Sequence, residues 1–272
     1  MIKLHYCRAN NFGDAMNPIL IECLTGQKCI YAGKHSAKII GIGSILNGFT
    51  RPRFGKTIID MFSPPATVWT SGFIKEVDWH ESIRKNIKFA ALRGKITQAR
   101  MEKSVGHKID TELGDGGLLF DHLIDKMPNK KYAIGLTPHC QDINNPIWQK
   151  ILDNYPNSVL INFRDNPLEI LHKIAECDFI LSTAMHGLIA ADSLGIPNKW
   201  LQLSKLIGDD YKFKDYYSVF NLVPKHLTTD DINDGLLTTK IITKFTDEYP
   251  IEYKKVKEIQ EKLFKALISA CK

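Results

Sequence analysis

The sequence lacks the patterns that indicate secretion, a membrane span or a structural metal site. Its six cysteines never approach a C-x-x-C spacing, so in a chain of this length they are expected to be reduced and mostly buried. No apolar stretch reaches the ~18 residues that cross a bilayer, and the N-terminus has no apolar signal-peptide segment. We therefore expect a cytoplasmic protein and leave open peripheral contact with the inner face of a membrane.

Motifs for nucleic acids, dinucleotides and metals are also missing. The formal net charge is +6, but Lys and Arg are scattered and form no basic stripe interleaved with aromatics, which disfavours nucleic acid. The GIGS run at 41–44 is not G-x-G-x-x-G and has no acidic residue about 20 positions later, so a dinucleotide site is disfavoured. No histidine and carboxylate cluster is visible, and we expect neither a metal nor a cofactor.

What is present is an alternation of short apolar runs with helical patterns, which is typical of parallel sheets flanked by helices. The chain is therefore predicted to be α/β, with a polar, turn-prone linker at 125–131 between two similar halves, 1–127 and 128–272. The expected strands are 2–7, 28–32, 37–43, 66–72, 87–94, 132–139, 158–163 and 178–184. The expected helices include 14–24 (with Pro18 in its first turn), 146–154, 167–176 and an amphipathic C-terminal helix within 248–272.

Polar residues follow most of the predicted strands, at the edge where open parallel sheets bind ligands. Each one has an ordinary explanation, such as a turn, a cap or a surface ion pair. Two histidines and an arginine among them nevertheless favour a functional cleft over a set of unrelated structural residues. The residues in question are Asn11, Asp14, Ser44, Ser71, Arg93, Asp115, His139, Arg164, Ser182 and His186.

His186 is the sharpest candidate, because a buried strand runs directly into a helix of small residues at this point. A helix that begins there directs free N–H groups and a partial positive charge at an anion. The histidine could bind a phosphate or carboxylate oxygen and also transfer a proton. A histidine hydrogen-bonded within the core is the alternative, but polar Ser182 and Thr183 beside it favour a functional role.

Eight segments, in this order, resemble the polysaccharide pyruvyl transferase family, and most of all its exopolysaccharide ketal-pyruvate transferases. The similarity runs from about residue 5 to 220, and a co-linear set of this kind is specific although no single segment would be. The segments are NFGDAMNPILIECLTG (11–26), IGIGSIL (40–46), VWTSGFI (68–74), ALRGKIT (91–97), LGDGGLLF (113–120), IGLTPHCQD (134–142), STAMHGLIAADSLGIPNKWL (182–201) and KFKDYYSVF (212–220).

The resemblance implies two Rossmann-like domains in a glycosyltransferase-B-like arrangement, with the active site between them. The first domain, 1–127, would face the acceptor, and the second, 128–272, would face the donor. The donor would be phosphoenolpyruvate, and the acceptor a pair of sugar hydroxyls on a polysaccharide or its lipid-linked repeat unit. The products would be a pyruvate ketal and phosphate.

The family motifs fall on Arg93, His139, His186 and Lys212. Arg93 would bind the donor carboxylate or phosphate with its planar guanidinium, Lys212 would hold the phosphate, and His186 would act as the acid. Asp14 would orient or deprotonate the acceptor hydroxyl.

Further substrate contacts are expected from His139, Ser182, Asn11 and Ser44. Ala184 stands where many members of the family carry an arginine, which would leave more of the carboxylate binding to Arg93.

Two other functions remain open from the residues alone, because a fold does not determine an activity. One is a nucleotide-sugar-dependent glycosyltransferase of the same architecture, acting in surface polysaccharide synthesis. The other is a carbohydrate- or phosphate-binding module without catalysis. Acceptor identity, ketal regiochemistry and oligomeric state are left open as well.

Overall fold

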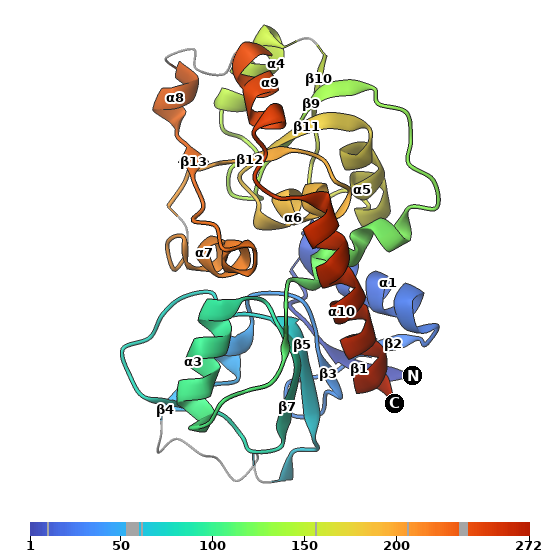
Figure 1. Ribbon diagram of the computed structural model, residues 1–272, viewed down its shortest axis with the longest axis vertical. Helices are drawn as coiled ribbons and strands as arrows, with labels where there is room; N and C mark the ends of the chain where they lie inside the picture. Colours follow the sequence, from blue (N-terminus) through green and yellow to red (C-terminus); the bar gives the residue numbers. More distant parts are fainter. Residues whose placement is uncertain (10, 53–59, 61, 156, 206, 234–238) are drawn as a thin grey trace.

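Two parallel sheets with helices packed beside them make up the computed structural model (Figure 1), which confirms the predicted α/β class. The structure describes residues 1–9, 11–52, 60, 62–155, 157–205, 207–233 and 239–272. The sheet formed by the first half of the chain lies at one end of the molecule in Figure 1, and the sheet formed by the second half at the other.

The first sheet has the order β2-β1-β3-β5-β7-β8, and all of its neighbouring strands are parallel. Its strands are β1 (Ile2–His5), β2 (Cys29–Tyr31), β3 (Ile39–Ile40), β5 (Ala66–Ser71), β7 (Ile87–Leu92) and β8 (Glu112–Leu113). The helices of this half are α1 (Phe12–Thr25), α3 (Lys95–Val105) and the 3₁₀ segments η1 (Leu46–Gly48) and η2 (Gly116–Leu123). A short antiparallel pair, β4 (Arg51–Pro52) and β6 (Glu81–Ser82), lies apart from the sheet.

The second sheet has the order β10-β9-β11-β12-β13 and is also parallel throughout. Its strands are β9 (Tyr132–Thr137), β10 (Ser158–Leu160), β11 (Cys177–Ser182), β12 (Asn198–Leu201) and β13 (His226–Leu227). The helices are α4 (Ile147–Asn154), α5 (Pro167–Ala175), α6 (Met185–Ser193), α7 (Tyr211–Tyr217), η3 (Ser218–Phe220), α8 (Thr229–Asn233), α9 (Thr239–Asp247) and α10 (Tyr253–Cys271).

Both sheets change direction of strand addition at the same place in their topology. In the first sheet, β2 lies on one side of β1 and β3 on the other. In the second sheet, β10 lies on one side of β9 and β11 on the other. The switch points are therefore between β1 and β3 and between β9 and β11. Crevices form at such switch points, outside the carboxyl ends of the strands, because the two flanking loops diverge to opposite faces of the sheet. The topology therefore marks one crevice in each half.

Helix α1 begins two residues earlier than the sequence predicted. The Asn11 side chain caps it by accepting a hydrogen bond from the Asp14 backbone N–H at 3.1 Å, so Pro18 lies inside the helix and not in its first turn. A proline there leaves the carbonyl four residues earlier without its helical donor. The Asn17 amide supplies a replacement, since its Nδ2 donates to the Asp14 carbonyl at 3.2 Å.

One hydrophobic cluster extends across both halves. The Phe12 ring of α1 lies 5.5 Å from that of Phe120 and 5.0 Å from that of Phe163, which follows a strand of the second sheet. Burial of apolar surface of this kind is the main favourable term in holding two layers together. The two halves therefore pack on a shared core.

The C-terminal helix α10 confirms the amphipathic pattern and places it on the first sheet. Val256, Ile259, Leu263 and Leu267 are buried, and the Trp69 indole N–H of β5 donates to the Leu263 carbonyl at 3.0 Å. In Figure 1 the helix runs along the sheet of the first half, and the two termini lie close together. The sequence analysis grouped this helix with the second half. The division at 127/128 is untested and stays a prediction.

All six cysteines are free, but only Cys177 and Cys271 are buried, so the expectation of mostly buried thiols was wrong. Among the described residues, no helix combines the length and the apolar character that crossing a membrane requires.

Candidate active site

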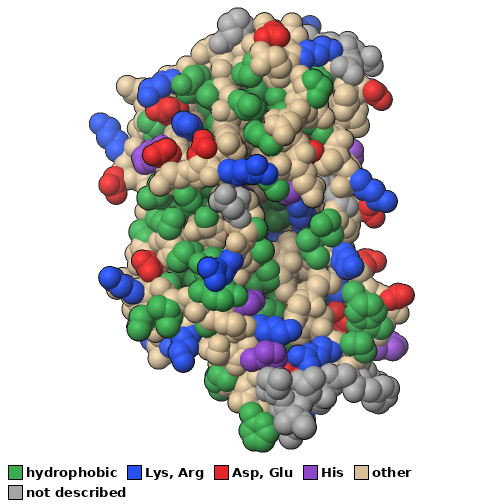
Figure 2. Space-filling view, turned by 180° about the vertical axis from the view of Figure 1, so that it is seen from behind, with side chains coloured by type: hydrophobic (Ala, Val, Ile, Leu, Met, Phe, Trp, Pro, Cys, Tyr) green, Lys and Arg blue, Asp and Glu red, His purple; other side chains and the backbone are tan. Residues whose placement is uncertain are grey.

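The loops at the two topological switch points meet each other. His186 lies in the first turn of α6, directly after β11, and its ring packs on the backbone of Gly13 at the start of α1. A Cβ atom on Gly13 would lie 1.9 Å from His186 Nδ1, so only glycine permits this approach. The two helix N-termini place partial positive charge at the same point. Figure 2 shows a hollow between the two halves with Lys or Arg and His side chains beside it.

One ring nitrogen of His186 is buried without a partner. This atom, Nε2, has no hydrogen-bond partner among the described residues, although the residue as a whole is only partly buried. Burial lowers the pKa of His186 from 6.5 to about 3, and the positive charges of Lys212 and Arg93 add to the effect. The ring is therefore neutral at pH 7, and a buried polar atom of this kind is costly unless a ligand completes it.

Lys212 brings a cation into the same cluster from the start of α7. Burial lowers its pKa from 10.5 to about 8, and the charge of Arg93 contributes, while Asp14 and Asp142 act in the opposite direction. Lys212 in turn lowers the pKa of His139, after the larger effect of burial. The structure thus places Lys212 within electrostatic reach of the other predicted groups from both halves.

Asp14 is held by the residue that caps its helix. Asn11 Nδ2 donates to Asp14 Oδ2 at 2.5 Å, while Asn11 Oδ1 accepts from the Asp14 backbone N–H. Burial raises the pKa of Asp14, and its hydrogen bonds to Asn11 and Cys7 and the charge of Lys212 oppose this. A partly desolvated carboxylate beside a lysine has the position and the basicity for proton transfer.

Arg93 has no exposed surface and forms a buried ion pair. Its Nε donates to Asp215 Oδ2 at 2.8 Å, Nη1 to Ser44 Oγ at 2.5 Å and Nη2 to the Phe73 carbonyl at 2.5 Å. Asp215 is on α7, three residues after Lys212, and also accepts from the Thr97 backbone N–H and hydroxyl at 2.8 and 2.6 Å.

The Arg93–Asp215 ion pair connects α7, the helix of Lys212, to the first half. The Ser44 hydroxyl also accepts a hydrogen bond from the Arg93 guanidinium. The guanidinium thus contacts protein groups on three sides, and direct binding of a substrate by Arg93 or Ser44 stays a prediction.

His139 and Ser182 are anchored by neighbouring backbone. The His139 backbone N–H donates to Thr183 Oγ1 at 2.7 Å, and its Nδ1 accepts from the Gln141 N–H at 3.4 Å, so the neutral ring carries its proton on Nε2. Ser182 Oγ lies within hydrogen-bond distance of the Thr137 and Ala184 carbonyls, at 2.9 and 2.8 Å, and accepts from the Ala184 N–H at 3.0 Å. These bonds give Ser182 a structural role in the turn before α6, and its predicted substrate contact is untested.

Arg164 falls outside the cluster, because it is exposed and lies 3.5 Å from the Cys140 carbonyl. The Ser71 hydroxyl is occupied by the backbone, since it donates to the Gly41 carbonyl. Asp115 caps η2 through the Gly117 N–H at 2.9 Å and is buried within electrostatic reach of Arg93 and Asp215.

Three members of the site were missed. The missed residues are Asp215, Asp142 and Asn17. Asp215 lies inside the KFKDYY segment, where a charge among aromatics was the available signal, but neither Asp142 nor Asn17 carried one.

Within the parts of the chain that the structure describes, no group of three or more His, Cys, Asp or Glu side chains could hold a metal ion. What the cluster does offer is a lysine, an unsatisfied histidine and two facing helix N-termini. These groups suit a small, multiply charged anion.

Comparison with known proteins gives a consistent result. The family profile of polysaccharide pyruvyl transferase matches residues 28–201, more than half of the chain. An uncharacterized protein of Acanthamoeba polyphaga mimivirus is 34% identical over 137 residues, 48% of this chain and 47% of that protein. The succinoglycan biosynthesis protein ExoV of Rhizobium meliloti (strain 1021) is 25% identical over 211 residues, 76% and 60% of the two chains. The chain spans about half to three fifths of the length of these relatives.

Proposed function

The chain belongs to the polysaccharide pyruvyl transferase family, and on that premise we propose that it transfers the pyruvate unit of phosphoenolpyruvate to a pair of sugar hydroxyls. The products are a pyruvate ketal and phosphate. The observation that carries the proposal is the buried, unpartnered Nε2 of His186 beside Lys212. An anion bound there would give the nitrogen a hydrogen-bond partner and would pair with the ammonium group of Lys212.

The two sheets would form two Rossmann-like domains in a glycosyltransferase-B-like arrangement, divided near residue 127. The first half would present the acceptor and the second the donor. The approach of His186 to Gly13 supports this arrangement, because it brings the switch-point loop of each half against that of the other.

The reaction needs two new C–O bonds at C2 of the donor and loss of its C2–O bond to phosphate. One hydroxyl proton of the sugar ends on the methylene carbon, which becomes the methyl group of the ketal, and the other ends on the departing phosphate. Phosphoenolpyruvate carries about three negative charges near neutral pH. A pocket for it has to supply cations and oriented donors, and this scheme uses neither a metal nor a cofactor.

Lys212 and His186 form the donor side of the scheme. Lys212 binds the phosphate as a point charge from α7. The negative charge of the bound donor raises the pKa of His186 from its low value in the empty site, so that Nε2 gains a proton. The protonated ring then donates to the leaving phosphate, and His139 contributes the N–H of its Nε2 from the adjacent loop.

Asp14 forms the acceptor side. Its carboxylate, oriented by Asn11, accepts the proton of the attacking hydroxyl. ExoV is named for succinoglycan biosynthesis, which supports an exopolysaccharide or its lipid-linked repeat unit as the acceptor class. We place the reaction in the cytoplasm, at the inner face of the membrane where such repeat units would be presented.

The test is phosphate release from phosphoenolpyruvate in the presence of a panel of free and lipid-linked glycans. We expect release that depends on an acceptor and a product in which pyruvate is bound as a ketal, detected by mass spectrometry. Phosphoenolpyruvate at 100 times its Kd should also add about 2.7 kcal/mol to the free energy of unfolding. No phosphate release with any acceptor, together with turnover of a sugar nucleotide, would overturn the proposal.

A further inference from the structure

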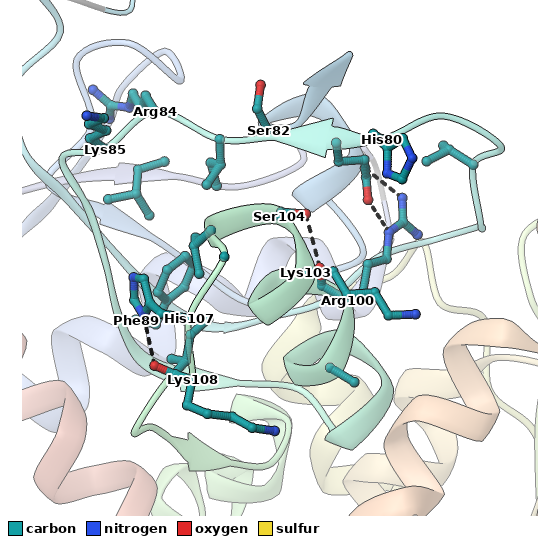
Figure 3. Close-up of a pocket in the computed structure, with 18 of the residues that line it drawn as sticks. His80, Ser82, Arg84, Lys85, Phe89, Arg100, Lys103, Ser104, His107 and Lys108 are labelled. Atoms are coloured by element: carbon teal, nitrogen blue, oxygen red, sulfur yellow. Dashed lines mark hydrogen bonds and ion pairs between the residues drawn. The ribbon is translucent and has the colours of Figure 1, made fainter. Parts of the chain in front are cut away.

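A second hollow lies on the outer side of the first half, away from His186. It is a groove of about 1300 Å³ between α3 on one side and the β6 strand and its flanking segments on the other (Figure 3). In Figure 3, Ser82 lies on the β6 side, Lys103 and Ser104 lie on α3, and Phe89 lies next to His107. Pockets for drug-sized molecules measure roughly 300–1,000 Å³, so this groove exceeds what a donor as small as phosphoenolpyruvate occupies.

The groove combines an apolar floor with a basic rim. Its lining includes core residues of the first half such as Ile83 and Ile87, together with partly buried Phe89 and Ile96. Around them stand six Lys or Arg side chains against three Asp or Glu. The six are Arg84, Lys85, Lys88, Arg100, Lys103 and Lys108. An excess of cations in a concave surface focuses positive potential on whatever enters it.

Several of these cations are not committed to a protein partner. Arg100 is paired with Glu81 at 2.5 and 2.8 Å, but Lys85, Lys88 and Lys103 are exposed and form none of the ion pairs found among the described residues. Arg84 is 9% exposed and donates from Nη1 to the Pro64 carbonyl at 2.7 Å. Its Nε and Nη2 are buried without a hydrogen-bond partner in the described chain; the charge of Asp60 acts on the guanidinium, and both nitrogens keep N–H donors for an anionic ligand.

The groove also offers a flat aromatic surface, and one residue of α7 takes part in its lining. Trp79 lines it and is 48% exposed, which leaves the indole available for the apolar face of a sugar ring. At the other side the lining includes Tyr211, the residue that precedes Lys212 on α7. The Arg100 guanidinium lies 3.7 Å from the centre of the Phe73 ring and 5.9 Å from that of Tyr211. The groove and Lys212 therefore share helix α7.

We propose that this groove binds an anionic stretch of the saccharide acceptor and so selects acidic glycan chains for the reaction. The inference rests on the proposed function for the identity of the ligand as an acceptor. The negative charge can come from sugar carboxylates or from a phosphate at the end of the glycan, and both would meet the same rim of lysine and arginine.

The test compares the affinities of three oligosaccharides by isothermal titration calorimetry. The probes are trigalacturonic acid, with carboxylates, maltotriose 1-phosphate, with a terminal phosphate, and neutral maltotriose. We expect at least one charged probe to bind ten times more tightly than maltotriose, and the one that does identifies the source of the charge. Equal affinity for all three, or no binding of any, would overturn the proposal.

A pair of matched variants assigns that affinity to the groove. The triple variant Lys85→Glu, Lys88→Glu and Lys103→Glu should weaken binding of the charged probe at least tenfold. The control changes the same charge on exposed lysines of α10, with Lys254→Glu, Lys262→Glu and Lys265→Glu, and should stay within twofold of the wild type. Equal weakening in both triples would show a diffuse effect of net charge and would overturn the groove as a site.

The donor provides the measurement that separates the two proposals. The rise in melting temperature on adding phosphoenolpyruvate should be the same in the groove variant and the wild type, because Lys212 and His186 are untouched. Suppose that phosphoenolpyruvate does not change the melting temperature of either protein, while the groove variant binds the charged probe more weakly than the wild type. The proposed function is then wrong and the groove remains a glycan-binding site. If phosphoenolpyruvate turns over normally with acidic glycans in the groove variant, the groove fails and the function stands.

Discussion

Two pairs of polar side chains lie near each other in this molecule, Arg93–Asp215 and Lys212–His186, and they differ in how completely the protein satisfies them. The Arg93–Asp215 pair is fully buried, and both Asp215 oxygens and all three guanidinium nitrogens have partners. The Lys212–His186 pair is joined to it through α7, yet His186 Nε2 has no partner in the described chain and both pKa values are displaced.

The difference separates a structural role from a ligand-binding one. A buried ion pair whose atoms are all satisfied fixes the position of the elements it connects, here α7 against the first half. A buried group left unsatisfied costs free energy in the empty protein and gains it back when a ligand supplies the missing partner. The first pair therefore positions α7 against the first half, and the second is the pair that we propose binds the donor.

The largest expected effect comes from removing the unsatisfied group. His186→Gln should lower kcat for phosphate release by roughly 10²–10⁴, the usual contribution of general acid catalysis. Its free energy of unfolding should stay within about 1 kcal/mol of the wild type, because no protein hydrogen bond to Nε2 is lost. Steady-state kinetics and urea unfolding measure the two quantities.

His172→Gln, on the exposed face of α5, is the matched control and should keep full activity. A His186→Gln or His186→Ala enzyme that retains more than a tenth of the activity would contradict the catalytic role.

Substitution in the Arg93–Asp215 pair should instead lower the stability of the protein. Arg93→Met leaves Asp215 as a buried carboxylate without its cation and should cost about 3–5 kcal/mol in the free energy of unfolding. The double variant Arg93→Met with Asp215→Leu removes both charges and should recover much of that loss. Urea unfolding of the two single variants and the double variant gives the coupling energy.

If Arg93→Met instead unfolds normally but no longer binds phosphoenolpyruvate, the arginine contacts the donor directly, as the family resemblance implies. That outcome would assign Arg93 a role in donor binding, as we propose for His186.

The smallest effect concerns the charge of Lys212. Its pKa of about 8 means that the ammonium group is present below that pH and is lost as the pH rises through it. The Kd of phosphoenolpyruvate should therefore increase above pH 8, approaching tenfold per pH unit, since a bound anion favours the protonated form. Calorimetric titrations between pH 6.5 and pH 9.5, a range of about three units around that pKa, measure this profile.

Lys212→Arg, which stays charged throughout this range, should remove the additional rise in Kd that begins near pH 8 and leave the pH dependence that comes from protonation of His186 in the complex. Lys214→Met, at an exposed lysine two residues along the same helix, should leave it unchanged. A wild-type Kd that does not vary with pH would remove Lys212 from the binding site.

Much of this arrangement could be predicted, because local patterns carry it. Alternating apolar runs indicated the parallel sheets, and polar residues at their carboxyl ends indicated which loops matter. The predicted helix 167–176 is confirmed as α5, whose start carries local signals, because the Asn166 side chain caps it and Pro167 occupies its first turn. Asn11 as the cap of α1 was not recognised as such, which shifted the predicted start of that helix.

The remainder depends on contacts between distant residues. Arg93 and Asp215 are 122 positions apart, and the bond from Trp69 to Leu263 in α10 joins positions 194 apart. No pattern within a window of the sequence specifies such partners, because a buried charge and an amphipathic helix each suit many surfaces until the chain is folded.

The sequence by itself determined the α/β class, eight strands of the two sheets and His186 at the end of one of them, but it did not predict β8, β12 and β13. The local periodicity of apolar side chains and the chemistry of strand ends and helix caps suffice for that. Only the tertiary structure decided which charges are satisfied, because satisfaction depends on what the rest of the chain brings to each atom. It placed Asp215 on Arg93 and left His186 Nε2 without a partner beside Lys212.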